Sequence, residues 1–177
     1  MKALCHALAL LILCVGCSGN YEVPPYAPLC GEVVEIPDCD INMSTPAELG
    51  DFIGEKATLI MFYTGGCSYC HEEMTIFPEI KEEFGDGVSI IVILLKDIYG
   101  ASSEKKLCLW SCFEERKYGG DIHYLIQLNM DMYETLGGNG VPYNIFLDSQ
   151  CNVAGTLFGA DASAIKTILR GVVNKGL

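Results

Sequence analysis

The segment at residues 57–84 constrains the fold more than any other part of the sequence. Residues 57–63 are a continuous apolar run, which predicts a strand buried on both faces. A Thr-Gly-Gly turn at 64–66 ends the strand. Residues 68–84 then carry apolar side chains at helical spacing, with a kink expected at Pro78. A buried strand that leads into a helix predicts a second, parallel strand on the far side of that helix.

The rest of the chain supplies the partners of this unit. Residues 88–95 predict a second buried strand, and a helix capped by Ser103 runs to about residue 117. A third strand is predicted at residues 122–128 and a short helix at 131–136. Two hairpin strands follow at 143–147 and 153–158, and a last helix begins after 161 and ends near residue 174. A short helix is predicted at 45–52. This order predicts an α/β fold with a mixed central sheet and helices on both faces.

Cys67 and Cys70 stand between the first buried strand and its helix. A Cys-x-x-Cys pair at such a junction is typical of a redox dithiol. Cys67 would lie at the helix N-terminus, where free backbone N–H groups and the helix dipole favour the attacking thiolate. Cys70, one turn further, would resolve the mixed disulfide. The alternatives are a structural disulfide and half of a zinc site, which has no second Cys-x-x-Cys to complete it. Because the dithiol carries the electrons, we expect no metal and no organic cofactor.

The segment Leu-Ile-Met-Phe-Tyr-Thr-Gly-Gly-Cys-Ser-Tyr-Cys-His-Glu-Glu-Met at 59–74 resembles the active-site strand, turn and helix of thioredoxin-like proteins. It is most similar in style to the membrane-anchored TlpA/ResA group of extracytoplasmic thiol–disulfide oxidoreductases. Val141 and Pro142, which precede a predicted strand, resemble the cis-proline loop of that family. The resemblance covers about residues 40–175. It implies a thioredoxin fold, with residues 32–177 as the domain.

The resemblance also implies roles for single residues. Pro142 would be cis and face the dithiol, and the backbone of Val141 would pair with a substrate chain. Tyr69 belongs to the variable pair between the cysteines that helps set the redox potential, and we assign it, with Val141, to substrate binding. The usual direction in the TlpA/ResA group is reduction. The expected partners are therefore protein thiols and disulfides, together with a redox partner that the sequence does not identify.

The sequence departs from the family at two positions near the dithiol. Gly66 stands where the family usually has tryptophan, and Met61 stands where thioredoxins place a buried acid. Glu73 matches a glutamate of ResA-like proteins and would accept the proton of Cys70. The alternative for Glu73 is an exposed helix glutamate. His71 would favour the thiolate if charged, and is otherwise an exposed helix histidine.

Five further cysteines follow the N-terminal segment. Cys30 and Cys39 close a short loop and predict a structural disulfide. Cys108 and Cys112 share one face of a predicted helix, where they form a second redox pair, a strained staple or two thiols with other partners. Cys151 is left over after these pairings, so it is free or competes for Cys108 or Cys112.

The N-terminus predicts export. Residues 1–16 combine one lysine with a short apolar run, which is typical of a signal peptide and too short to span a bilayer. Gly16-Cys17 resembles the lipobox of bacterial lipoproteins, which implies a lipid on Cys17 and a linker at 17–31. We therefore expect an extracytoplasmic, membrane-anchored protein that faces the periplasm, and Ser18 favours the outer membrane in a host that has one. The alternative is an ordinary signal peptide with an accidental cysteine.

Charge and spacing bear on the rival functions. The formal net charge of -12 excludes a basic surface for nucleic acid. A thiol peroxidase would share the Thr-x-x-Cys pattern at 64–67, but Ile60 stands where that pattern has proline. A copper chaperone would use a spaced cysteine pair, as at 108–112, with His123 as the distant ligand. A non-catalytic binding lipoprotein is the remaining alternative.

Overall fold

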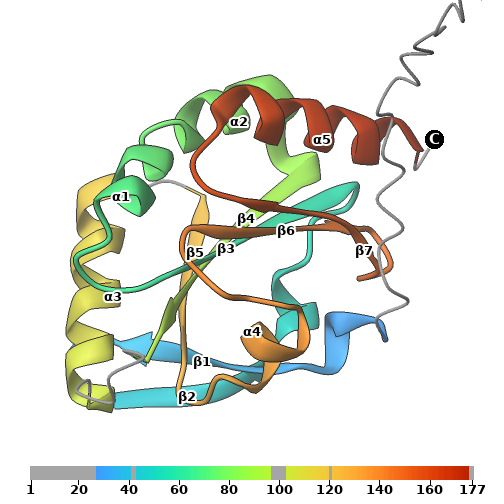
Figure 1. Ribbon diagram of the computed structural model, residues 1–177. Helices are drawn as coiled ribbons and strands as arrows, with labels where there is room; N and C mark the ends of the chain where they lie inside the picture. The colour runs from blue at the N-terminus through green and yellow to red at the C-terminus, as the bar shows by residue number, and fades with distance from the viewer. Residues whose placement is uncertain (1–26, 41–42, 97–102, 120, 176–177) are drawn as a thin grey trace, which may run out of the picture.

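A computed structural model describes residues 27–40, 43–96, 103–119 and 121–175 (Figure 1). Its strands are β1 (Val33–Asp38), β2 (Met43–Glu48), β3 (Ala57–Tyr63), β4 (Val88–Leu95), β5 (Ile122–Gln127), β6 (Tyr143–Asp148) and β7 (Val153–Phe158). Its α-helices are α1 (Ser68–Met74), α2 (Phe77–Phe84), α3 (Glu104–Tyr118), α4 (Asp131–Thr135) and α5 (Ala162–Lys175). Short 3₁₀ helices are η1 (Leu29–Gly31), η2 (Leu49–Phe52) and η3 (Gly85–Gly87). The signal peptide and Cys17 predicted above lie outside the described residues.

The strands form one mixed sheet in the order β2-β1-β5-β4-β3-β6-β7. The central strands β3, β4 and β5 run parallel, as expected for strands joined by helical crossovers. The remaining pairs are antiparallel. On one side of the sheet β6 pairs with β3 and β7 pairs with β6; on the other side β1 pairs with β5 and β2 pairs with β1. The predicted α/β class with a mixed central sheet is confirmed. Within the described part of the chain, no helix combines the length and apolar character needed to cross a membrane.

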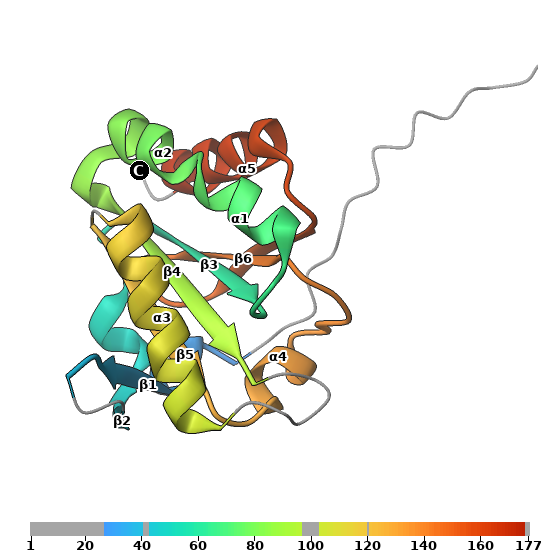
Figure 2. The same ribbon diagram turned by 90° about the vertical axis from the view of Figure 1, so that its left-hand side faces the viewer.

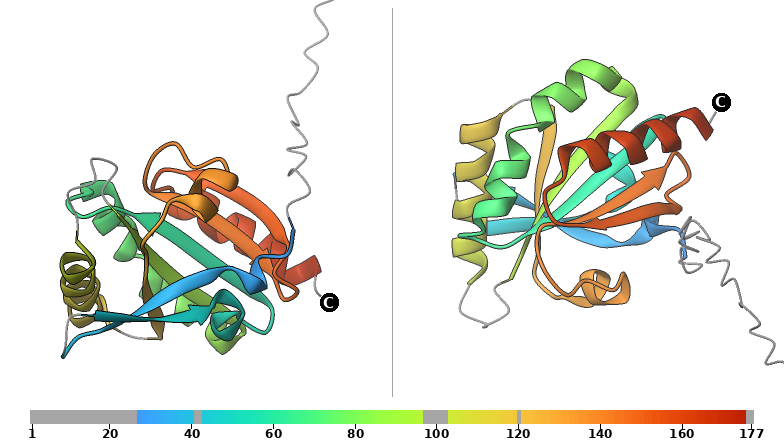
Figure 3. Two further views of the ribbon diagram at one scale, coloured as in Figure 1. Left: turned by 90° about the horizontal axis from the view of Figure 1, so that it is seen from below. Right: turned by 45° about the horizontal axis from the view of Figure 1, so that its top comes forward.

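Both faces of the sheet are covered, which explains the continuous apolar run of β3. Leu59, Met61 and Tyr63 point into a core under α1, α2, α3 and α5. Ile60 and Phe62 point into a second core, which α4, η1 and η2 cover from the other side (Figures 1 and 3). Since alternate residues of a strand face opposite sides, both sets of β3 side chains are buried, and all of them except Thr58 are apolar.

The helix predicted at 68–84 is two helices with a bend between them. α1 ends at Met74 and α2 starts at Phe77, with a hydrogen-bonded turn at Thr75 and Ile76. Pro78 lies in the first turn of α2, where the missing N–H group has no partner to lose. The bend therefore precedes the proline instead of falling on it.

The helix predicted at 45–52 is found only in its second half, as the short 3₁₀ helix η2. Its first half belongs to β2, which pairs with β1, a strand that the sequence analysis did not predict. Pro46 is compatible with β2 because β2 lies at the edge of the sheet, where a strand tolerates proline. Before β1, Leu29 is buried in η1, so residues before position 32 also pack against the sheet.

The predicted pairing of Cys30 with Cys39 is also wrong. Cys30 forms a disulfide with Cys151, and Cys39 forms one with Cys112. The two cysteines expected to pair lie at opposite ends of β1, about 20 Å apart, which no disulfide can bridge. Cys151 is therefore not the odd residue. Among the described cysteines, Cys108 is the free one, and it is buried.

Candidate active site

The dithiol lies at the point where β3 passes into α1 (Figure 2). Cys67 is the N-cap residue of α1, and its sulfur accepts the backbone N–H of Cys70 at 3.2 Å. The two cysteines form a disulfide with their Cα atoms 5.3 Å apart. Cys67 is partly exposed, whereas Cys70 is fully buried. An incoming thiol therefore reaches Cys67 first, and Cys70 is placed to attack the same sulfur from inside.

The proline loop lies at the same end of the sheet. The peptide bond between Val141 and Pro142 is cis, as the resemblance implies. Pro142 leads into β6, whose first residue, Tyr143, pairs with Phe62 near the end of β3. The Pro142 carbonyl accepts the Gly159 N–H at 2.9 Å, which ties the loop to the end of β7. Val141, immediately before the cis bond, is partly exposed.

A groove of about 280 Å³ runs beside the dithiol turn and the proline loop. Its apolar lining includes Leu95, Met130, Tyr133 and Val141, and Thr64 closes it on the side of the dithiol. The Tyr133 hydroxyl donates a hydrogen bond to the carbonyl of Gly140 at 3.0 Å, which fixes one wall. Glu134 and Asn139 also line it, so this surface offers apolar contacts together with polar groups near the dithiol turn.

Glu73 is buried one turn after Cys70, with 2% of its surface exposed. The side-chain amide of Asn144, in β6, donates to Glu73 Oε2 at 3.2 Å, while Oε1 has no partner among the described residues. Burial raises the pKa of Glu73 to about 7, and the Asn144 hydrogen bond offsets only part of that rise. A carboxyl group with such a pKa exchanges protons readily near neutral pH.

A second buried carboxylate lies on the other side of α1. Glu114, in α3, is 5% exposed, and its Oε1 lies 3.1 Å from Nε2 of His71. The Tyr63 hydroxyl is buried near it without a hydrogen-bond partner in the described chain. Burial, with the nearby Glu114 carboxylate, holds the pKa of Tyr63 well above its usual range. His71 is thus held in a specific pair instead of lying free on the helix surface.

Of the remaining predicted residues, Tyr69 lies beside the dithiol and His123 does not. Tyr69 is 67% exposed between the two cysteines, so its ring is accessible to a bound partner. His123 lies near the start of β5, and because β5 runs parallel to β3 this is the end of the sheet opposite the dithiol. The structure therefore does not bring His123 to the Cys67–Cys70 pair.

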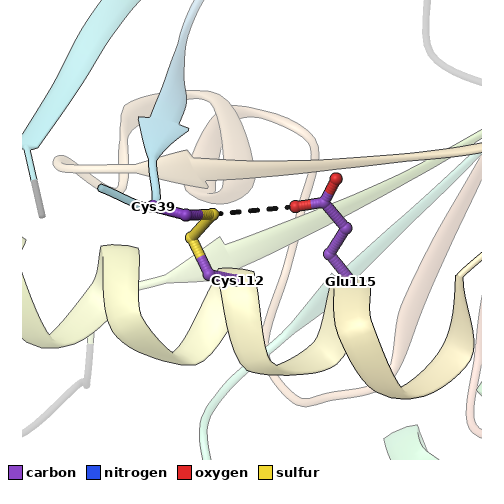
Figure 4. Close-up of side chains that lie close together, drawn as sticks. All are labelled: Cys39, Cys112 and Glu115. Carbon is purple, nitrogen blue, oxygen red and sulfur yellow. Dashed lines mark hydrogen bonds between the residues drawn. A yellow bond between two sulfur atoms is a disulfide. The ribbon is translucent and has the colours of Figure 1, made fainter. Parts of the chain in front are cut away.

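One group of three potential metal ligands converges in the described part of the chain (Figure 4). Cys39 and Cys112 are joined by their disulfide, and Cys39 Sγ lies 3.8 Å from a carboxylate oxygen of Glu115. Disulfide sulfurs are not thiolates, the form that binds metal, so in this oxidised form Glu115 alone offers a charged ligand.

Sequence reasoning missed Asn144 and Glu114. Asn144 left a signal, because it is a polar residue inside the apolar strand β6 and such residues need a buried partner. Nothing in the sequence marks Glu114 as buried, because it stands among the lysines, arginine and glutamates of α3, a pattern typical of a solvent-facing position.

No protein-family model matches the chain, and no curated protein matches it by sequence. Several solved structures are similar to it in fold. The pneumococcal exposed lipoprotein thioredoxin Etrx1 of Streptococcus pneumoniae is 22% identical with a TM-score of 0.62, over 78% of this chain and 98% of that one. The thioredoxin domain of a thiol–disulfide oxidoreductase from Bacteroides vulgatus is 20% identical, with a TM-score of 0.58 over 81% and 97% of the two chains. StoA of Bacillus subtilis is 15% identical, with a TM-score of 0.53 over 80% and 98%.

This chain has the thioredoxin fold. The likeness extends over nearly the whole of each solved domain, so the strands and helices that carry the dithiol and the proline loop belong to the shared architecture. The fold class implied by the segment at 59–74 is therefore confirmed. At these sequence identities the comparison concerns the fold, and the activity has to be argued from the site itself.

Proposed function

We propose that this protein is a thiol–disulfide oxidoreductase, working as a reductase of extracytoplasmic protein disulfides. The observation that carries the proposal is the asymmetry of the dithiol. Cys67 is accessible at the N-terminus of α1, and Cys70 is buried behind it. Adjacent to the pair, the cis Val141–Pro142 loop and the apolar groove give a substrate chain a place to lie. A purely structural disulfide needs neither feature.

The reaction begins with the reduced protein. The Cys67 thiolate attacks one sulfur of a substrate disulfide, whose S–S bond breaks and leaves a thiolate on the substrate. The mixed disulfide at Cys67 is held beside Val141 and Pro142. The Cys70 thiolate then attacks Cys67 Sγ, which forms the Cys67–Cys70 disulfide and releases the second substrate thiolate. Two electrons have moved to the substrate, and a dithiol donor restores the protein.

Glu73 supplies the proton step of this sequence. A buried Cys70 thiol must lose its proton before it can attack, and the ionised Glu73 carboxylate one turn away accepts it. The raised pKa of Glu73, about 7, matches this task better than an ordinary carboxyl would. Asn144 orients the carboxylate through its hydrogen bond to Oε2.

The proposed location is outside the cytoplasm, with the chain anchored by a lipid on Cys17 after removal of residues 1–16. The disulfides Cys30–Cys151 and Cys39–Cys112 support an oxidising compartment. One of the similar solved structures is an exposed lipoprotein thioredoxin, which supports this placement. Within the thioredoxin-like proteins, we place the chain nearest the TlpA/ResA group on its Glu73 position.

Trapping of the mixed disulfide tests the proposal. Cys70→Ser should leave Cys67 linked to a disulfide-containing substrate protein, because the resolving thiol is gone. Cys67→Ser should trap nothing, and Cys108→Ser, which removes the buried free thiol, should behave as the wild type. No adduct with Cys70→Ser would overturn the proposal.

The reduction potential of the Cys67–Cys70 pair tests the direction. A value near that of thioredoxin, about -270 mV, supports a reductase, whereas a value near about -120 mV makes the protein an oxidant. Rapid turnover of a hydroperoxide without exchange on protein disulfides would replace the proposal with a thiol peroxidase.

A further inference from the structure

Trp110, the only tryptophan of the chain, lies against the turn that carries Cys67. A Cβ atom added to Gly65 would stand 1.4 Å from Cζ3, 1.9 Å from Cε3 and 2.3 Å from Cη2 of the Trp110 ring. These three atoms belong to the six-membered ring of the indole, so that ring occupies the space that any side chain at position 65 would need. The glycine at position 65 is therefore matched to the tryptophan on α3.

The turn beneath the ring has few restraints of its own. The N–H of Cys67 donates to the carbonyl of Thr64 at 3.2 Å and closes the turn. Gly66 has a φ of 82°, and a Cβ atom there would meet nothing within 4 Å. Two successive glycines give a backbone with wide conformational freedom. The contact from Trp110 thus restrains a flexible turn two residues before the reactive sulfur.

The helix that presents Trp110 is itself fixed on both sides. Two residues further along α3, Cys112 is bonded to Cys39 at the end of β1. On the side of the dithiol, Glu114 pairs with His71 of α1 at 3.1 Å. The ring therefore rests on the turn from a rigid support, and its place does not depend on the turn itself.

The other side of the ring faces solvent. Trp110 is 44% exposed, and Phe113, one turn along the same face of α3, is 58% exposed. Tyr69, between the two cysteines in α1, is 67% exposed, so Tyr69 and Trp110 both present exposed aromatic rings near the dithiol. Exposed aromatic rings beside a reactive group are typical of contact residues for polypeptides.

We propose that Trp110 is a positioning residue for Cys67 and a contact for the substrate polypeptide. One side of its ring holds the turn at 64–66, and the other receives an apolar side chain next to the substrate disulfide. The inference rests on the proposed function and adds a substrate class to it: polypeptides with an aromatic or aliphatic residue beside the reactive cysteine.

Kinetics with two disulfide peptides, identical except for Phe or Ser beside one cysteine, test the contact. Trp110→Ala should raise KM for the Phe peptide about tenfold, as for the loss of an aromatic pair, and leave KM for the Ser peptide nearly unchanged. It should also lower kcat for both peptides, because Cys67 is less well placed. Trp110→Phe should retain most of both parameters. Leu109→Ala, which removes a neighbouring side chain that is 47% exposed, should change neither.

A double-mutant cycle tests the positioning. Gly65→Ala places a Cβ atom in the space of the ring, so it should slow exchange in the wild type. In the Trp110→Ala background the same change should have little effect, because the ring is absent. Additive effects of the two changes would overturn the contact.

The emission of the single tryptophan supplies a readout that does not need a substrate. A disulfide quenches a nearby indole, so reduction of Cys67–Cys70 should raise the Trp110 emission with the midpoint found by thiol alkylation. The Cys67→Ser/Cys70→Ser protein keeps the Cys39–Cys112 disulfide and should lose this change, which excludes the second disulfide as its source. A wild type that exchanges with neither peptide would overturn the proposed function. An unchanged emission, or Trp110→Ala kinetics equal to those of Leu109→Ala in an active wild type, would overturn this inference alone.

Discussion

Replacement of Glu73 by glutamine should change the pH dependence of stability in a defined direction. Burial raises the pKa of Glu73 from its usual value near 4.5 to about 7 in the folded protein. Between these two values the folded state binds a proton that the unfolded state has lost, so the free energy of unfolding falls as the pH rises through this window. The shift of about 2.5 units corresponds to about 3 kcal/mol, all of it lost above pH 7.

Glu73→Gln keeps an oxygen that can accept the Asn144 hydrogen bond but cannot ionise. We therefore expect the variant to exceed the wild type in stability by up to about 3 kcal/mol at pH 8, and to match it only below the unfolded-state pKa of 4.5. Urea unfolding of the oxidised protein, followed by circular dichroism from about pH 4 to pH 8, measures the difference. Glu72→Gln, an exposed change on the same turn, is the matched control. Parallel pH profiles for wild type and Glu73→Gln would refute the reasoning.

The same substitution should reduce activity while it raises stability. Without a proton acceptor, Cys70 resolves the mixed disulfide about 100-fold more slowly, which is a typical loss for a general base. Stopped-flow measurement of mixed-disulfide decay gives this rate. A stabilised but slow variant would identify Glu73 as a group kept for chemistry at a cost in stability.

Three further changes have expected outcomes of their own. Joint replacement of Cys30 and Cys151 by serine opens a loop of 121 residues and should lower the free energy of unfolding by about 5 kcal/mol, measured by denaturant titration. Asn144→Ala removes the hydrogen bond that lowers the pKa of Glu73, so that pKa should rise above 7, which NMR titration of the carboxyl group would show. Gly54→Ala places a Cβ atom 2.4 Å from the carbonyl oxygen of Ala57 and should lower stability by about 1–3 kcal/mol, whereas an unchanged melting temperature would contradict the packing described.

The central strands could be predicted from the sequence because each is marked by the residues of its own segment. β3 and β4 are continuous apolar runs, and the turn at 64–66 separates strand from helix without ambiguity. The Cys-x-x-Cys pair could be assigned for the same reason, since its chemistry depends on one strand-to-helix junction. The strands β1 and β2 could not be predicted, because their exposed residues carry little periodic signal and β1 pairs along its length with β2, the strand at the edge of the sheet.

Disulfide pairing and buried acids depend on contacts between distant segments, and here sequence reasoning failed. Cys30 and Cys39 are close in sequence, but β1 holds them at opposite ends of a strand, and their partners come from elsewhere in the chain. Glu73 could be named only through the family resemblance. Its buried carboxyl group accepts a hydrogen bond from Asn144, 71 residues away, and no local pattern in the sequence records that contact.

The Cys30–Cys151 bridge determines where a tether would leave the domain. Cys151 lies in the turn after β6, next to the start of β3, whereas Cys67 follows the other end of that strand, about 20 Å away (Figure 1). The chain from Cys17 to Leu29 spans at most about 40 Å when extended. If the protein is anchored at Cys17, as proposed, the dithiol would therefore stay within about 60 Å of the bilayer surface. Disulfides of proteins that lie beyond that layer would be out of its reach.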